Sequence, residues 1–145
     1  KGEVPDDVGP IPLGQARIAR AGRDLTVVSY GAMVHKVERA AEALARDGIE
    51  AEVLDLRSIQ PWDEAAVLAS LRRTHRLLIV HEAVEAFGVG AEIAARMADI
   101  GFDELDAPIV RVAAPFVPVP FAPSLEAQYQ PQEADIIAAA RKLCA

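Results

Sequence analysis

The fold of this chain is decided by residues 76–97, which read RLLIVHEAVEAFGVGAEIAARM. Residues 77–80 form a continuous apolar run, which indicates a strand covered on both faces. His81 and Glu82 follow at once, where such a strand is expected to emerge at its carboxyl end. A loop with two glycines then leads into an apolar-periodic helix from Gly90 onward. This is half of a βαβ unit, and binding groups in open α/β sheets gather at the carboxyl ends of strands.

The rest of the chain repeats this unit. We expect strands at residues 15–20, 25–30, 50–56, 77–80 and 109–113, and helices at residues 32–47, 63–73, 90–97 and 132–143. Helices between apolar strands imply parallel pairing with right-handed crossovers, and hence a three-layer α/β/α sandwich. Only the first strand is joined to its successor by a tight turn, so only that strand can be antiparallel.

Two segments lack a regular pattern. Residues 1–13 contain three prolines and two glycines, so we interpret them as a linker or arm before a domain at residues 14–145. Because the first residue is Lys1, we interpret the chain as either processed or a piece of a longer protein, and the linker-like pattern of its first residues favours a piece. Residues 114–131 contain five prolines and are too long for an ordinary connection. That segment is also apolar, which favours packing on a partner over disorder.

Composition narrows the possible partners and location. The net charge of −7 comes without any basic run, which disfavours nucleic acid and anionic membranes as partners. No apolar run approaches the ~20 residues that span a bilayer. The single cysteine, Cys144, permits no internal disulfide. This agrees with a reducing compartment, and we expect a cytoplasmic protein.

His81 and Glu82 are the first candidates for a site. They could line an active site, transfer protons or bind a metal, but His35 and His75 are poorly placed to supply further metal ligands. The alternative is structural: Glu82 caps a turn, and His81 ends the strand with a hydrogen bond to the backbone. The sequence Gly88-Val89-Gly90 resembles part of a dinucleotide fingerprint, but it lacks the third glycine, so close packing of loop and helix explains it better.

Other site chemistries find little support. The helix start at Gly31 could hold an anion, but ordinary turn geometry explains it equally well. Ser29 lies inside a strand, and Cys144 lies at the tail with no histidine near it in sequence. The acidic cluster of response regulators and the Ser/Thr-rich phosphate loop of flavodoxins are both missing after the strand at residues 25–30. We therefore assign no catalytic residue.

Four acidic residues crowd the end of the helix at residues 90–97, namely Asp99, Asp103, Glu104 and Asp106. Negative charge at a helix C-terminus costs a few tenths to ~1 kcal/mol per group. These residues form either a solvated face or a docking patch for a basic partner, because electrostatic steering rewards such clusters.

Seven motifs in unbroken order name a family: IPLGQAR (11–17), TVVSYGAMVHK (26–36), VLDLRSIQPWD (53–63), HEA (81–83), GAEIA (90–94), LDAP (105–108) and VPFAP (119–123). Together they resemble the C-terminal domain of the β subunit of a thiamine diphosphate-dependent 2-oxoacid dehydrogenase. The resemblance implies a transketolase C-terminal fold with a five-stranded mixed sheet in the order 1-3-2-4-5 and strand 1 antiparallel.

The resemblance also implies an activity for the parent enzyme. That enzyme decarboxylates a 2-oxoacid and passes the acyl group to a lipoyl arm. Its thiamine diphosphate and magnesium are held by the α subunit and by the β subunit's N-terminal domain, which also carries the catalytic histidine. His81 should therefore not inherit that role, and this domain alone should be inactive and bind no cofactor or metal.

The implied role of this domain is protein binding. It would assemble an α subunit and a second β subunit into a heterotetramer. It would also dock the small basic binding domain of the dihydrolipoyl acyltransferase. The docking residue by resemblance is Asp106, with the terminal carboxylate of Ala145 as its usual companion and Asp103 and Glu104 beside it. His81 and Glu82 remain possible site-lining residues.

The chain departs from the family in the loop at residues 85–89. There Glu85 reverses a charge, and Phe87 replaces a glycine. The motifs at residues 81–83 and 119–123 favour a branched-chain 2-oxoacid as the substrate, while Val34-His35-Lys36 also occurs in pyruvate enzymes. A pyruvate or acetoin dehydrogenase β subunit is the alternative, and an independent α/β domain with a small-ligand pocket near Gly31 and His81 is another.

Overall fold

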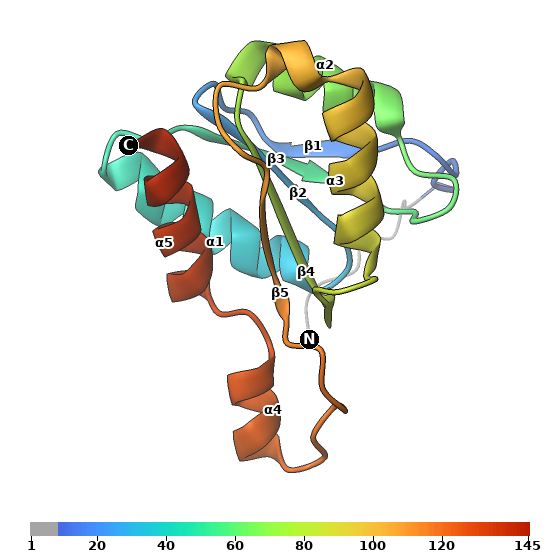
Figure 1. The fold of residues 1–145 in the computed structure, drawn as a ribbon, viewed down its shortest axis with the longest axis vertical. Helices are drawn as coiled ribbons and strands as arrows, with labels where there is room; N and C mark the ends of the chain where they lie inside the picture. The colour runs from blue at the N-terminus through green and yellow to red at the C-terminus, as the bar shows by residue number, and fades with distance from the viewer. Residues whose placement is uncertain (1–8) are drawn as a thin grey trace.

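A computed structural model describes residues 9–145 (Figure 1). Its elements are β1 (Arg17–Arg20), β2 (Leu25–Ser29), α1 (Met33–Arg46), β3 (Ala51–Asp55), α2 (Glu64–Thr74), β4 (Leu77–Val84), α3 (Val89–Ile100), the 3₁₀ turn η1 (Phe102–Glu104), β5 (Val110–Ala114), α4 (Pro123–Tyr129) and α5 (Glu133–Cys144). Most of the predicted linker, residues 1–8, lies outside the described residues. Residues 9–13 are exposed and form neither helix nor strand.

The sheet has the predicted topology. Its five strands lie in the order β1-β3-β2-β4-β5. β1 pairs antiparallel with β3, and the remaining neighbours pair in parallel. The α/β class, the strand order and the antiparallel edge strand are thereby confirmed.

Helices cover both faces of the sheet, which makes the expected three layers (Figure 1). The central strand β2 shows why: Val27 packs into the cluster under α1 and α5, and its neighbour Val28 packs into the cluster under α2 and α3. Because successive side chains of a strand point to opposite faces, a strand buried on both sides is largely apolar, as Leu25, Val27 and Val28 of β2 are.

Asp63 is the N-cap of α2, whose first residue is Glu64. One carboxylate oxygen of Asp63 accepts a hydrogen bond from the Ala66 N–H at 3.0 Å, which satisfies a free donor of the first helical turn. The other oxygen accepts from the Ala16 N–H at 2.9 Å. One side chain therefore caps a helix and also ties the approach to the edge strand β1.

A buried hydroxyl network joins α2 to the sheet. Thr26 Oγ1 lies 2.6 Å from Ser70 Oγ and 2.7 Å from Thr74 Oγ1. Ser70 also donates to Glu52 Oε1 at 2.5 Å, and Arg73 pairs with the same carboxylate. Every member has a partner, so the network orients α2 without leaving a buried polar group unsatisfied.

The structure differs most from the sequence expectation at two places, and α3 also runs on to Ile100. β4 continues to Val84 instead of ending at Val80, because Val84 pairs with Ala114 of β5 past an irregularity in the ladder. The predicted loop at residues 114–131 contains the helix α4, which starts with Pro123 at a position where the missing N–H costs nothing. This segment projects from the body of the domain (Figure 1).

Candidate functional site

His81 lies inside β4 and is completely buried. Its Nε2 accepts a hydrogen bond from the main-chain N–H of Gly90 at 3.1 Å. Gly90 is in the first turn of α3, where N–H groups have no partner within the helix. His81 therefore fastens the start of α3 to the sheet.

The two glycines allow this close contact. A Cβ atom at position 90 would lie 2.2 Å from His81 Nε2, and a Cβ at position 88 would lie 2.0 Å from the carbonyl oxygen of Val84. Neither distance is possible for real atoms, so both positions require glycine. The glycine pair thus serves close packing between loop, strand and helix, which is the interpretation that the sequence favours over a dinucleotide fingerprint.

Burial sets the charge state of His81. Removal from water lowers the pKa of the imidazole, and nearby Arg111 lowers it further, although the Ala83 main chain and Glu85 act in the opposite direction. The neutral ring also suits Nε2 as an acceptor. The Tyr30 ring stacks on the His81 ring, with the two centroids 6.1 Å apart. The pKa of the Tyr30 hydroxyl is raised, mainly by burial and also by the negative charge of Glu82.

Glu82 points elsewhere and is exposed. Its side chain lines a hollow of about 260 Å³ between β4 and α4. The structure therefore does not bring the two sequence candidates together: His81 is part of the core, and Glu82 belongs to the surface beside the projecting segment.

Of the four acidic residues predicted as a cluster, Asp99 lies in the last turn of α3, and the other three lie in the surface loop that follows the helix. Asp103 and Asp106 are exposed, and Glu104 pairs with Arg72 at 3.3 Å. Asp99, the first of the series, lies 2.8 Å from Arg96, which offsets its unfavourable place near the helix end.

His75 holds this loop, a role that sequence reasoning missed. The residue ends α2 in the left-handed conformation, with φ of 57°. Its Nδ1 lies 2.9 Å from the Glu104 carbonyl oxygen, and its own carbonyl oxygen accepts from the Asp106 N–H at 2.9 Å. The left-handed position after a helix could have been suspected from the sequence, but both contacts depend on the tertiary structure.

The next residue, Arg76, holds the C-terminal helix. Its Nε donates to the Leu143 carbonyl oxygen at 2.9 Å. Consecutive residues before β4 therefore anchor both the acidic loop and the segment that ends in Ala145, which is exposed. Asp106 and Ala145 are far apart in sequence but are attached to the same point of the fold.

A second surface feature is a set of exposed apolar side chains, which the sequence analysis did not name as candidate site residues. We call it the arm surface; it consists of the exposed side chains of Phe87, Phe116, Val117, Val119, Phe121 and Leu125. A recess of about 340 Å³ lies within it, lined by Val84, Phe116, Val117 and Pro118. The sequence indicated an apolar partner-binding segment here, but not its shape.

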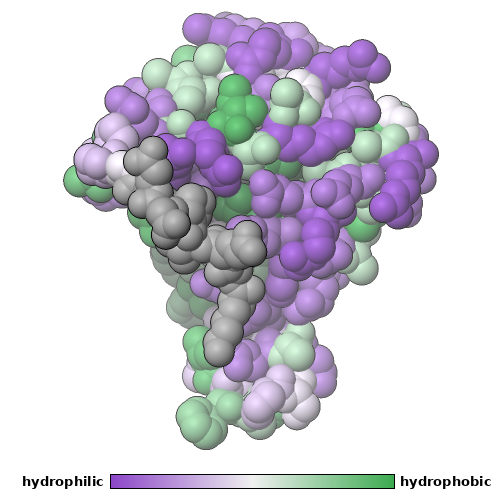
Figure 2. Space-filling model, turned by 180° about the vertical axis from the view of Figure 1, so that it is seen from behind, coloured by the Kyte–Doolittle hydropathy of each residue, from purple (hydrophilic) through white to green (hydrophobic). Residues whose placement is uncertain are grey.

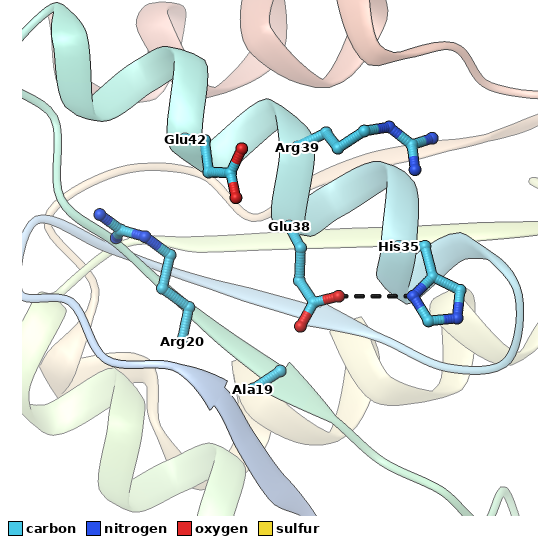
Figure 3. A pocket seen from close by; sticks show the side chains of 6 residues that line it. All are labelled: Ala19, Arg20, His35, Glu38, Arg39 and Glu42. Carbon is cyan, nitrogen blue, oxygen red and sulfur yellow. Dashed lines mark ion pairs between the residues drawn. The ribbon is translucent and has the colours of Figure 1, made fainter. Parts of the chain in front are cut away.

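A third hollow, of about 500 Å³, lies between β1 and α1 (Figure 3). Its two arginines already have partners: Arg20 pairs with Glu50, and Arg39 pairs with Glu133. Within the hollow, His35 Nδ1 lies 3.5 Å from the Glu38 carboxylate. These pairings leave no concentrated charge of one sign for a ligand.

Among residues 9–145, no group of three or more histidine, cysteine, aspartate or glutamate side chains is arranged to hold a metal ion. Over the same residues, no helix has the length and apolar character that a membrane span requires.

Fold and surface together define the class of protein: a mixed-sheet α/β sandwich of the transketolase C-terminal type, with an antiparallel edge strand. Residues 14–136 match the family described as "Transketolase, C-terminal domain", and the chain belongs to that family.

Its relatives are longer proteins. The chain is 50% identical over 143 residues to the acetoin:2,6-dichlorophenolindophenol oxidoreductase subunit beta of Bacillus subtilis (strain 168), which covers 99% of this chain and 42% of that protein. It is 43% identical over 142 residues to the mitochondrial pyruvate dehydrogenase E1 component subunit beta-2 of Oryza sativa subsp. japonica, covering 98% of this chain and 38% of that protein. The chain thus spans less than half the length of these relatives.

A solved structure titled "Split gene transketolase, inactive beta4 tetramer" has the same fold. It superposes with a TM-score of 0.80 at 28% sequence identity, covering 97% of this chain and 46% of that one.

Proposed function

We propose that this chain is the C-terminal domain of the β subunit of a thiamine diphosphate-dependent dehydrogenase, and that it docks an acyltransferase and assembles the subunits. The similarity to two named β subunits supports this proposal. Both relatives are named for acetoin or pyruvate, so we propose an acetoin or pyruvate enzyme over the branched-chain enzyme that the motifs favoured.

Thiamine diphosphate with magnesium would supply the decarboxylation chemistry of the complete enzyme. Among residues 9–145, no group of three or more histidine, cysteine, aspartate or glutamate side chains is arranged to hold the magnesium ion. We assign no step of the reaction to these residues, and we propose that this domain contributes by binding other proteins.

One observation carries the docking proposal: the residue pair His75 and Arg76 holds the acidic loop and the C-terminal helix at one end of the sheet. The carboxylates of Asp103 and Asp106 stay exposed on a loop that is fixed at its main chain. A fixed set of negative charges is complementary to a small basic domain and would increase the rate of its association.

Calorimetric titration tests this proposal. The basic binding domain of a dihydrolipoyl acyltransferase is titrated into this chain at low and at high salt. We expect saturable one-to-one binding that weakens as salt screens the charges. Absence of binding at low salt would refute docking by this domain.

The arm surface supports the second part of the proposal, subunit assembly. Monomeric soluble proteins rarely expose an apolar patch larger than a few hundred Å², and larger patches mark interfaces. An α subunit and a second β subunit are the proposed partners. The solved relative whose title names a beta4 tetramer supports contacts between β chains.

A further inference from the structure

The strand order places a ligand crevice between β2 and β4. After β2 the chain passes through α1 on one face of the sheet to β3, and then through α2 on the other face to β4. In open α/β sheets, ligands bind at the carboxyl ends of the strands where the winding reverses in this way. Tyr30 directly follows β2, and Glu82 lies in the last part of β4. The fold therefore places both side chains at the edge where a ligand is expected.

A hollow of about 260 Å³ lies at this edge. We call it the β4–α4 hollow; its lining residues are Glu82, Val119, Glu126, Tyr129 and Gln130. They come from β4 and from the projecting segment, on which Figure 2 shows hydrophilic and hydrophobic residues side by side. One chain thus supplies the whole lining, and no partner is needed to complete it.

The β4–α4 hollow carries negative charge that the protein does not neutralise. Among residues 9–145, neither Glu82 nor Glu126 forms an ion pair. Lys36 reaches the adjoining Pro131, but its ammonium group donates to the main-chain carbonyl oxygen there at 2.9 Å. Gln130 Nε2 lies 3.4 Å from Glu126 Oε1, which is a neutral contact at long range. Two carboxylates without a counterion in one recess attract a cation.

Tyr129 gives a second, independent indication of a ligand. Its side chain is only 9% exposed and lines the hollow, yet its hydroxyl has no hydrogen-bond partner among residues 9–145. Buried polar groups of folded proteins normally have a partner. The Tyr129 hydroxyl is not one of the fully enclosed atoms without a partner, which are Ser29 Oγ and His81 Nδ1, so it can be reached from the hollow.

The mixed lining favours an organic cation over a metal ion. Magnesium and calcium take six or more oxygen ligands, whereas this hollow offers two carboxylates together with the Val119 side chain and the Tyr129 ring. The volume is also far larger than the ~30 Å³ that one water molecule occupies. Guanidinium and ammonium groups donate to carboxylates and lie well against aromatic rings, which matches this set of side chains.

We propose that the β4–α4 hollow binds a small organic cation with a guanidinium or ammonium group, held by the carboxylates of Glu82 and Glu126, with the Tyr129 hydroxyl accepting one of its hydrogen bonds. The bound cation joins the end of β4 to α4, because its two carboxylate partners come from these elements. The inference does not depend on the proposed function, since the acidic loop is attached at the other end of β4, next to His75.

A titration with agmatine tests the proposal, because agmatine carries a guanidinium and an ammonium group and no negative charge. Amide chemical shifts of the isotope-labelled chain are followed at constant ionic strength. We expect saturable shifts around the β4–α4 hollow with a Kd of about 1 mM, which is ordinary for a ligand of this size. Magnesium chloride at the same ionic strength should produce none. Shifts that do not saturate with agmatine, or that magnesium reproduces, would overturn the proposal.

Three variants connect the binding to these side chains. Glu82→Gln, at an exposed position, should weaken agmatine binding at least about tenfold through loss of a charged hydrogen bond. Tyr129→Phe should weaken it severalfold without reducing stability, since the hydroxyl has no partner in the protein to lose. Glu92→Gln is the matched control, because Glu92 is exposed on α3 outside the hollow.

The proposal is overturned if Glu82→Gln and Tyr129→Phe both bind agmatine as tightly as the original chain. It is also overturned if Glu92→Gln weakens binding as much as Glu82→Gln does. Neither result would affect acyltransferase docking, which is measured separately at the acidic loop.

Discussion

The main-chain N–H of Asp106 donates to the carbonyl oxygen of His75 at 2.9 Å, which attaches the acidic loop to the end of α2. The His75 ring adds a second attachment through the Glu104 carbonyl oxygen. An acidic loop fixed at two points presents its carboxylates in one arrangement, so a partner does not bear the entropic cost of ordering it.

His75→Gly should therefore weaken docking without unfolding the domain. Glycine adopts the left-handed conformation of this position freely and keeps the main-chain bond to Asp106. Only the ring contact to Glu104 is lost. We expect the stability in urea to change by less than about 1 kcal/mol, and the affinity for the acyltransferase domain to fall severalfold. Unchanged affinity would show that the ring does not order the loop.

Gly90→Ala should destabilise the domain by about 1–3 kcal/mol, because the new Cβ would overlap with His81 Nε2. His81→Ala should also destabilise it, by about 2–4 kcal/mol, through the cavity left by the ring. In the double variant the added methyl group occupies that cavity. In urea unfolding, the double variant should therefore be destabilised by less than the sum of the two single variants, with a difference of more than about 1 kcal/mol. Strict additivity would contradict the contact between the two residues.

The stability of the domain should decrease at acidic pH because the buried His81 ring is neutral in the folded state. Its pKa in the folded state lies below that of the unfolded chain, so the unfolded state binds more protons as the pH falls below about 6.5. The stability contributed by the neutral ring is complete above that pH and is lost as the pH decreases. Urea unfolding at about pH 7.5 and pH 5.5 measures the loss.

The control for this experiment replaces an exposed histidine. His35→Gln should retain the acid-induced loss of stability, since the His35 side chain is largely exposed. His81→Gln should reduce that loss. If both variants keep the same pH dependence as the original chain, another group causes it.

Position 87 should reveal backbone strain. Phe87→Gly and Phe87→Ala both remove the ring and its contact with Phe116, but only glycine adopts a φ of 60° without steric strain. The glycine variant should therefore be more stable than the alanine variant by about 1 kcal/mol. Thermal or urea unfolding of the pair makes the comparison, and equal stability would argue against strain at this position.

The sequence predicted most of the sheet because its strands are short apolar runs between clear helices. Two features of the fold were not predicted from the sequence. β4 extends to Val84 because its last residues pair with β5, and such pairing depends on a distant segment. α4 is only seven residues long and lies among prolines, although Pro123 at its first position is an ordinary start signal.

The candidate site was predictable only in part. The acidic residues stand out in the sequence because they oppose the helix dipole. Their attachment to His75, and the attachment of the C-terminal helix to Arg76, depend on residues 29 and 67 positions apart. Likewise, the sequence pairs His81 with Glu82 as neighbours, but a strand sends neighbouring side chains to opposite sides.

Asp106→Lys gives the most direct test of the proposed function. The acyltransferase's basic binding domain is titrated by calorimetry into the original chain, into Asp106→Lys and into Glu42→Lys, an equal charge change on the exposed face of α1. The proposal predicts that Asp106→Lys costs about 2 kcal/mol or more, or about 30-fold in Kd, while Glu42→Lys binds nearly as the original chain does. Equal binding by both variants would contradict docking at the acidic loop.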